Sequence, residues 1–231
     1  MPKLIHYPLC PFSRSIRLAL AECGIDAELE EERPWLWRRA FLELNPAGTL
    51  PVLQDDDGNA LAGTYAVSEY LSDTGVDASP DSRAFAFFPG GAKERGEVRR
   101  LVDWFHGKFE AEVTSYLLEE KVYRRFDSRN GGAPDMELVR AGKANLRYHL
   151  RYIGHLVDER NWLAGQHLSY ADLAAAAHLS CIDYLGDVPW DEDDVARDWY
   201  ARIKSRPSFR PLLGDRIAGI TPPESYADPD F

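Results

Sequence analysis

Cys10 and Ser13 are the two residues of this chain whose chemistry and spacing stand out first. They lie in the stretch 7–14, YPLCPFSR, which follows a short apolar run and precedes a helical pattern of apolar residues. Pro11 suits the first turn of a helix, where its missing N–H removes no hydrogen bond. The positive end of that helix favours a thiolate or another anion. The stretch therefore predicts a thiol-handling site at a strand-to-helix turn.

The same two residues also have a purely structural interpretation. Cys10 is then only a turn residue, and the Ser13 hydroxyl satisfies free N–H groups at the start of the helix. Because position 13 is a serine, the chain lacks the second cysteine that dithiol–disulfide exchange of the Cys-x-x-Cys type requires. Catalysis at this turn would use the Cys10 thiol or the Ser13 hydroxyl.

The composition of the chain argues against several other classes of function. Its 27 Lys and Arg against 38 Asp and Glu give a net charge of −11, which argues against nonspecific binding to nucleic acid or to anionic membranes. Three cysteines are too few for a disulfide framework and fit a reducing cytoplasm. We find no signal-peptide pattern and no apolar run that approaches the length of a membrane span. The histidines have no metal-ligand spacing, and we expect no metal or other cofactor.

Residues 1–73 alternate between strand and helix patterns. In order, they predict strand 3–7, helix 11–23, strand 27–31, a helical turn from 34, strand 51–53, a hairpin return at 60–61 and a helix from 64. The turn at 55–59, DDDGN, is typical of hairpins. The order β-α-β-α-β-β-α predicts a thioredoxin-like domain.

The rest of the chain divides into three parts. Residues 74–90 are rich in Gly, Ser, Pro and Asp and predict a linker. Residues 91–205 have helical periods throughout and predict an all-helical domain. Residues 206–231 are rich in Pro, Gly and charged side chains and predict an extended tail.

Two helices of the second half have clear limits. An apolar stripe at i, i+3, i+4 spacing predicts a long helix from Ala92 to about Arg125. The stretch Ser169-Tyr-Ala-Asp172 is a variant capping box, in which hydroxyl and carboxylate each accept a backbone N–H. It predicts the start of a very apolar helix that continues to Leu185.

The two halves together resemble the glutathione transferase fold, an N-terminal thioredoxin-like domain followed by a C-terminal helical domain. The stretch 48–53, GTLPVL, is similar to the family's loop before the third strand, where the proline is cis. The resemblance implies that Pro51 is cis and that the backbone of Leu50 lies where the family pairs with the cysteinyl group of glutathione. The capping box at 169–172 is similar to the one that opens the family's buried sixth helix.

Gly63-Thr64 departs from the family pattern. Most members carry Glu-Ser or Asp-Ser there, so that a carboxylate helps to hold the γ-glutamyl amine of glutathione and the serine binds its carboxylate. Thr64 can still accept an anion at a helix N-terminus, but Gly63 offers no carboxylate. Since a hydrogen bond to a charged group is worth roughly 1.5–3 kcal/mol, the loss implies a ten- to more than a hundred-fold lower affinity for glutathione.

Longer stretches are similar to one branch of the superfamily, the FzlA family of glutathione-transferase-like division proteins of alphaproteobacteria. They are FPGGAKER at 88–95, ANLRYHL at 144–150, YADLAAAA at 170–177, WYARIKSRPSFRPLL at 199–213 and YADPDF at 226–231. The resemblance implies a protein without enzymatic activity that binds polymers of the tubulin homologue FtsZ at the division site. It further implies that the protein favours curved filaments and helps to activate septal wall synthesis and constriction, with the tail serving the latter link.

Trp35 and Trp37 are the first candidates for binding this partner. Two residues apart on a helical turn, they cannot share one face, so at least one is expected at the surface, where tryptophan is a good interface anchor. The alternative for either residue is packing on the core.

Charged residues supply the other candidates. Glu119 and Arg124 lie near the end of the predicted long helix, and Arg140 lies near the start of the next one, so we expect the helix ends to meet above the cleft. They form either a polar recognition patch or an ordinary solvated face. In the tail, Asp228 belongs either to a short docking motif or to a disordered end.

Two further hypotheses stay open. The chain could be a working glutathione transferase or glutathione-dependent thiol reductase that uses Cys10 or Ser13, or a small-molecule sensor without turnover. By analogy with the fold we expect a homodimer.

Overall fold

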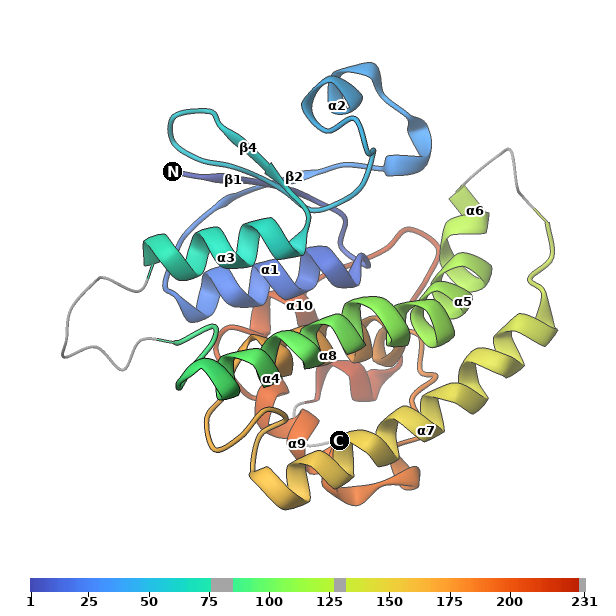
Figure 1. Cartoon of the computed structure of the whole chain (residues 1–231). Helices are drawn as coiled ribbons and strands as arrows, with labels where there is room; N and C mark the ends of the chain where they lie inside the picture. The colour runs from blue at the N-terminus through green and yellow to red at the C-terminus, as the bar shows by residue number, and fades with distance from the viewer. Residues whose placement is uncertain (76–84, 127–131, 229–231) are drawn as a thin grey trace.

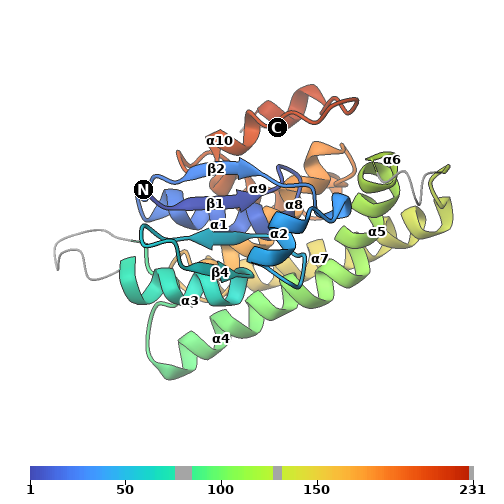
Figure 2. The same cartoon turned by 90° about the horizontal axis from the view of Figure 1, so that it is seen from above.

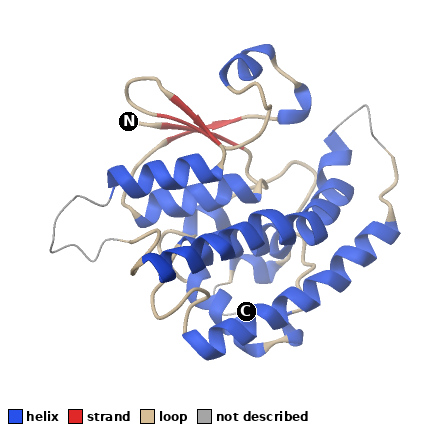
Figure 3. Cartoon of the chain, viewed as in Figure 1, coloured by secondary structure: helices blue, strands red, loops and turns tan. Residues whose placement is uncertain are grey.

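The computed structural model describes residues 1–75, 85–126 and 132–228. Part of the predicted linker, residues 127–131 after the long helix and residues 229–231 of the predicted tail lie outside the described residues. Within the described residues, strands occupy only the N-terminal half, and the second half is mainly helical (Figure 3). None of the described helices is both long and apolar enough to cross a membrane.

The N-terminal half has the predicted order of strands and helices. Its elements are β1 (Lys3–His6), α1 (Pro11–Glu22), β2 (Glu28–Glu31), η1 (Pro34–Leu36), α2 (Arg39–Leu44), β3 (Val52–Gln54), β4 (Ala60–Ala62) and α3 (Thr64–Gly75). The sheet order is β2-β1-β3-β4, with β2 parallel to β1 and the other pairs antiparallel, so β2 and β4 are its edges (Figure 2). Helices α1 and α3 lie between this sheet and the helical half (Figure 1). The thioredoxin-like unit and the glutathione transferase fold are thereby confirmed.

One long helix runs across the second half, as the apolar stripe predicts. It comprises α4 (Ala92–Asp103), η2 (Trp104–Thr114), α5 (Ser115–Leu118), η3 (Glu119–Tyr123) and α6 (Arg124–Phe126). The segments η2 and η3 have π-helical turns, which the sequence period did not predict. Such turns rotate the following side chains relative to an ideal α-helix and often lie at functional sites.

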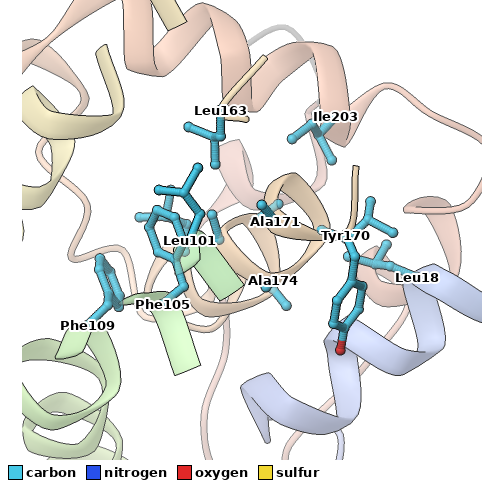
Figure 4. Packing of buried hydrophobic residues seen from close by; sticks show 14 of the residues in the cluster. Leu18, Leu101, Phe105, Phe109, Leu163, Tyr170, Ala171, Ala174 and Ile203 are labelled. Atoms are coloured by element: carbon cyan, nitrogen blue, oxygen red, sulfur yellow. The ribbon is translucent and has the colours of Figure 1, made fainter. Parts of the chain in front are cut away.

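The remaining helices surround α8 (Tyr170–Tyr184), in which every residue is buried. They are α7 (Met136–Arg160), η4 (Trp190–Glu192), α9 (Asp194–Lys204), α10 (Arg210–Leu213) and η5 (Glu224–Ala227). Small side chains such as Ala171 and Ala174 let neighbouring helices approach α8 closely (Figure 4). The resulting core joins the two halves, because Leu18 of α1 belongs to the same apolar cluster.

The predicted capping box at the start of α8 is present. The Asp172 carboxylate accepts the Ser169 N–H at 3.0 Å and the Leu163 N–H at 3.0 Å. It also accepts the indole N–H of Trp199, on α9, at 3.0 Å. A fully buried carboxylate is costly without such donors, so this one joins a helix start, the preceding turn and a second helix.

A buried arginine joins the N-terminal turn to the C-terminal segment. The Arg14 guanidinium, fully buried, donates to the Pro8 carbonyl at 2.6 Å, to Ser180 Oγ at 2.8 Å and to Asp215 Oδ2 at 3.2 Å. Arg17 pairs with the same carboxylate through two bonds of 2.8 and 3.0 Å. We call this group, Arg14, Arg17, Ser180 and Asp215, the arginine clamp.

The expectation of an extended tail needs correction for the described residues up to 228. The segment contains α10 and η5, and Tyr226 is fully buried, with its hydroxyl donating to the Leu212 carbonyl at 3.0 Å. Lys204 Nζ donates to the Ser225 carbonyl at 3.1 Å. The segment lacks a long period because it is held by individual anchors, and sequence periodicity cannot detect these.

We predict that Tyr226→Ala lowers the free energy of unfolding by about 3–5 kcal/mol, because it removes a fully buried aromatic ring. Tyr65→Ala is the matched control: its side chain is 71% exposed, so the expected change is about 0.5 kcal/mol or less. Urea unfolding of both variants measures the difference. Equal stabilities would mean that the tail is not packed.

Candidate functional site

A cleft of about 500 Å³ lies between the N-terminal turn and the long helix. It is lined by Tyr7, Cys10, Pro11, Phe12, Pro34, Trp35, Gly48, Thr49, Leu50, Gly63, Thr64, Glu110, Glu119 and Tyr123. The structure thus brings together the predicted turn, the proline loop and the start of α3. This is the place where the fold family binds glutathione.

The proline loop has the implied conformation, since the Leu50–Pro51 peptide is cis. The N–H of Gly63 donates to the Pro51 carbonyl at 2.9 Å, so the loop and the start of α3 are joined. Gly63 has a φ of +86°, which residues with side chains rarely adopt. The position is therefore suited to glycine, and no side chain there can hold an amine.

Cys10 caps α1, and its Sγ accepts the Ser13 N–H at 3.5 Å. Burial raises the pKa of its thiol to about 11, outweighing the hydrogen bonds from Ser13 that lower it. The expectation of a thiolate at this helix start is therefore wrong: near neutral pH the thiol is protonated and weakly nucleophilic.

Ser13 is fully buried and is not among the residues that line the cleft. Its hydroxyl oxygen lies 3.4 Å from the Tyr7 N–H, which donates to it. The side chain therefore braces the turn between β1 and α1. This geometry favours the structural interpretation of Ser13 over a role in activating a thiol.

The two tryptophans have different environments. Trp35 lines the cleft and packs on Tyr7, Tyr123 and Phe126 at ring-centroid distances of 4.9, 5.6 and 6.1 Å. Trp37 is 54% exposed. The expectation that at least one of them reaches the surface is confirmed, and Trp37 is that residue.

The helix ends predicted to meet do so through a buried carboxylate. Glu120, only 3% exposed, accepts the Asp135 N–H at 2.7 Å and Arg124 Nη1 at 2.8 Å. Arg124 therefore neutralises a buried charge and is partly structural. Glu119, at the cleft, and Arg140, on α7, are exposed.

Asp228 lies elsewhere in the molecule. It is exposed, directly follows η5, and is close enough to Lys204 for its charge to raise the pKa of that amine, although burial lowers the pKa overall. The predicted tail site is thus beside α9 and apart from the cleft residues.

Glu110 is a cleft residue that the sequence analysis missed. Its Oε2 is shielded from solvent and has no hydrogen-bond partner among the described residues, and burial raises the pKa of the carboxyl to about 7. His178 Nδ1 lies 3.5 Å away, but burial lowers the pKa of that imidazole far below its usual value, so it carries no charge. The sequence signal was a carboxylate beside the apolar stripe, on a segment that the structure shows to have π-helical turns.

Comparison with known proteins places the chain among glutathione-transferase-like proteins. Residues 9–74 match the family "Glutathione S-transferase, N-terminal domain". FtsZ-localized protein A of Caulobacter vibrioides (strain NA1000 / CB15N) is 43% identical over 231 residues, covering 99% of this chain and 97% of that protein.

Solved structures agree over the whole length. FzlA from C. crescentus has a TM-score of 0.92 at 42% identity, covering 100% of this chain and 99% of the other. A glutathione S-transferase from Rhodospirillum rubrum F11 has a TM-score of 0.94 at 48% identity, with 100% of both chains covered. The similar chains thus include one that is named as a division protein and one that is named as a transferase.

We predict that Glu110 makes the protein less stable as the pH rises. Its folded pKa of about 7 lies above the ordinary 4.5, so between these values the unfolded chain has released a proton that the folded chain keeps. The free energy of unfolding should therefore fall by roughly 3 kcal/mol over this window, and Glu110→Gln should abolish that fall.

Urea unfolding at several pH values, with Glu112→Gln as control, tests this. Glu112 lies on the same segment but pairs with Lys108 and His149 and does not line the cleft. A Glu110→Gln variant with the wild-type pH dependence would contradict the assignment.

Proposed function

Because the chain belongs to the family of FtsZ-localized protein A, within the glutathione transferase superfamily, we propose that it binds FtsZ filaments at the division site and is not an enzyme. The observation that carries the proposal is the 43% identity, which extends over 99% of the chain and therefore includes both halves and the tail. The proposal includes cytoplasmic localisation with recruitment to the septum.

The cleft supports the absence of thiol chemistry. A transferase has to hold glutathione and stabilise its thiolate or use a thiolate of its own. Here Gly63 lacks the carboxylate that the family uses, the Cys10 thiol is protonated, and Ser13 is buried outside the cleft.

Three exposed residues offer a surface for the filament instead. Trp37 presents an exposed indole, and Glu119 at the cleft and Arg140 on α7 present charges of both signs. Aromatic and arginine side chains are the usual anchors of protein interfaces. We propose that these three residues bind FtsZ and that Trp35 supports them from within the cleft.

Further parts of the proposal concern curvature and wall synthesis. A homodimer would present two copies of this surface, and two linked sites bind a polymer more tightly than one. We propose that the dimer favours curved filaments and that the segment around Asp228, apart from the cleft, links it to the wall-synthesis machinery.

Co-sedimentation with FtsZ polymers in the presence of GTP tests the proposal. We predict that the wild-type protein pellets with the polymer and that Trp37→Ala and Arg140→Glu each reduce the bound fraction several-fold. The loss of an interface anchor typically costs about 2 kcal/mol or more of binding free energy. Tyr148→Ala is the control. It truncates an aromatic side chain on α7 that is also exposed, and it should pellet like wild type.

The choice of variants matters for the outcome. Arg124→Glu would place a second carboxylate beside the buried Glu120 and disturb the fold, whereas Arg140 is exposed and its reversal should not. Wild-type protein that stays in the supernatant would sink the proposal. Pelleting that is unchanged in both variants would remove this surface from it.

A working glutathione transferase is the second candidate, favoured by the 48% identity to the Rhodospirillum rubrum enzyme and by the cis-proline loop. Calorimetric titration with glutathione discriminates between the two. We predict no saturable binding in the millimolar range, because Gly63 offers no carboxylate at the family's position for the amine and the two acids that line the cleft repel the carboxylates of glutathione. Saturable binding, with turnover lost in Cys10→Ala or Ser13→Ala, would establish the enzyme.

A further inference from the structure

The charges in the cleft are opposite to those that glutathione requires. Glutathione carries two carboxylates and one ammonium. Among the described residues that line the cleft there are two acids, Glu110 and Glu119, and no lysine, arginine or histidine. A cleft with this sign of charge attracts cations and repels anions, and the net charge of −11 acts in the same direction.

Glu110 is a carboxylate that lacks a counterion. Its side chain is 26% exposed and lines the cleft, while Oε2 has no hydrogen-bond partner among the described residues. The near neighbours His178 and Cys10 are neutral near pH 7, because burial lowers the pKa of the imidazole and raises that of the thiol. A cation in the cleft would therefore meet an uncompensated negative charge in apolar surroundings, where pairing is worth most.

The walls of the cleft are aromatic. Tyr7, Phe12, Trp35 and Tyr123 all line it, and Trp35 contacts both tyrosines. Aromatic rings attract ammonium groups through their quadrupole and also bury the apolar body of a ligand. A volume of about 500 Å³ is that of a site for a small molecule.

We propose that the cleft binds a small organic cation, an ammonium group on an aromatic or apolar body, with the ammonium at Glu110 and the body against the aromatic wall that Trp35 and Tyr123 form. The inference goes beyond the proposed function, because it concerns a ligand of the cleft interior and needs no FtsZ. It gives the cleft a binding role that does not depend on a thiolate.

Binding should strengthen as the pH rises through neutrality. The carboxyl of Glu110 loses its proton near pH 7, and the ammonium pairs with the ionised form. The other titratable groups that face Glu110 are Cys10, Tyr123, His178 and Cys181, and burial keeps all of them neutral there. Glu119, at the exposed rim, adds a further negative charge.

The experiment titrates the full chain with three probes of nearly equal shape, 2-phenylethylamine, 2-phenylethanol and phenylacetate, by calorimetry at about pH 8, where Glu110 is ionised. We expect the amine to bind with a millimolar or lower Kd and about ten-fold or more tighter than the alcohol, since a charge-assisted hydrogen bond is strong. Phenylacetate should not bind.

Two variants locate the site. Glu110→Gln should reduce the preference for amine over alcohol to about three-fold or less, because the charge is lost while the shape is kept. Glu112→Gln, on the same segment but outside the cleft lining, should keep the preference. Thermal unfolding of each variant verifies that it is folded.

The outcomes separate clearly. Absence of saturable amine binding, equal binding of amine and alcohol, or an amine preference that persists in Glu110→Gln would each overturn the inference. FtsZ is absent from the experiment, so none of these results bears on filament binding. Failure of co-sedimentation would likewise leave the cation site intact.

Discussion

The buried carboxylate of Asp172 is the interaction on which the helical half depends. It starts α8, a helix with every residue buried, and accepts hydrogen bonds from Ser169, Leu163 and Trp199. Removing any one of these donors would leave part of a charge unsolvated in the core. Because α8 also packs on α1, the helix that begins at Cys10, the same carboxylate indirectly positions the floor of the cleft.

Sequence reasoning succeeded where a repeated local pattern had a single physical solution. The alternation of strand and helix periods and the capping box each specify one backbone form, and both are present. The cis proline, also present, was implied by the resemblance to glutathione transferases. Sequence reasoning failed where the outcome depends on how deeply a residue is buried. Neither the protonated thiol of Cys10, the unpartnered Glu110 nor the buried Tyr226 could be predicted, because each depends on which distant elements cover it.

The cleft combines the backbone framework of the fold with its own set of charges. The proline loop and the start of α3 are joined by a backbone hydrogen bond from Gly63 to Pro51. The charges of the cleft are set by three features: no carboxylate at Gly63 before α3, a raised thiol pKa at Cys10, and an acid on the long helix. What such a cleft can bind depends on these ionisation states as well as on its backbone.

The arginine clamp has a mechanical consequence for the cleft turn and the C-terminal segment. Arg14 holds the Pro8 carbonyl, two residues before the cleft residue Cys10, and also the Asp215 carboxylate at the base of the C-terminal segment. A displacement of that segment that moves Asp215 therefore also disturbs the hydrogen bond at the cleft turn. Any energetic coupling that this guanidinium provides between the two ends acts equally in both directions.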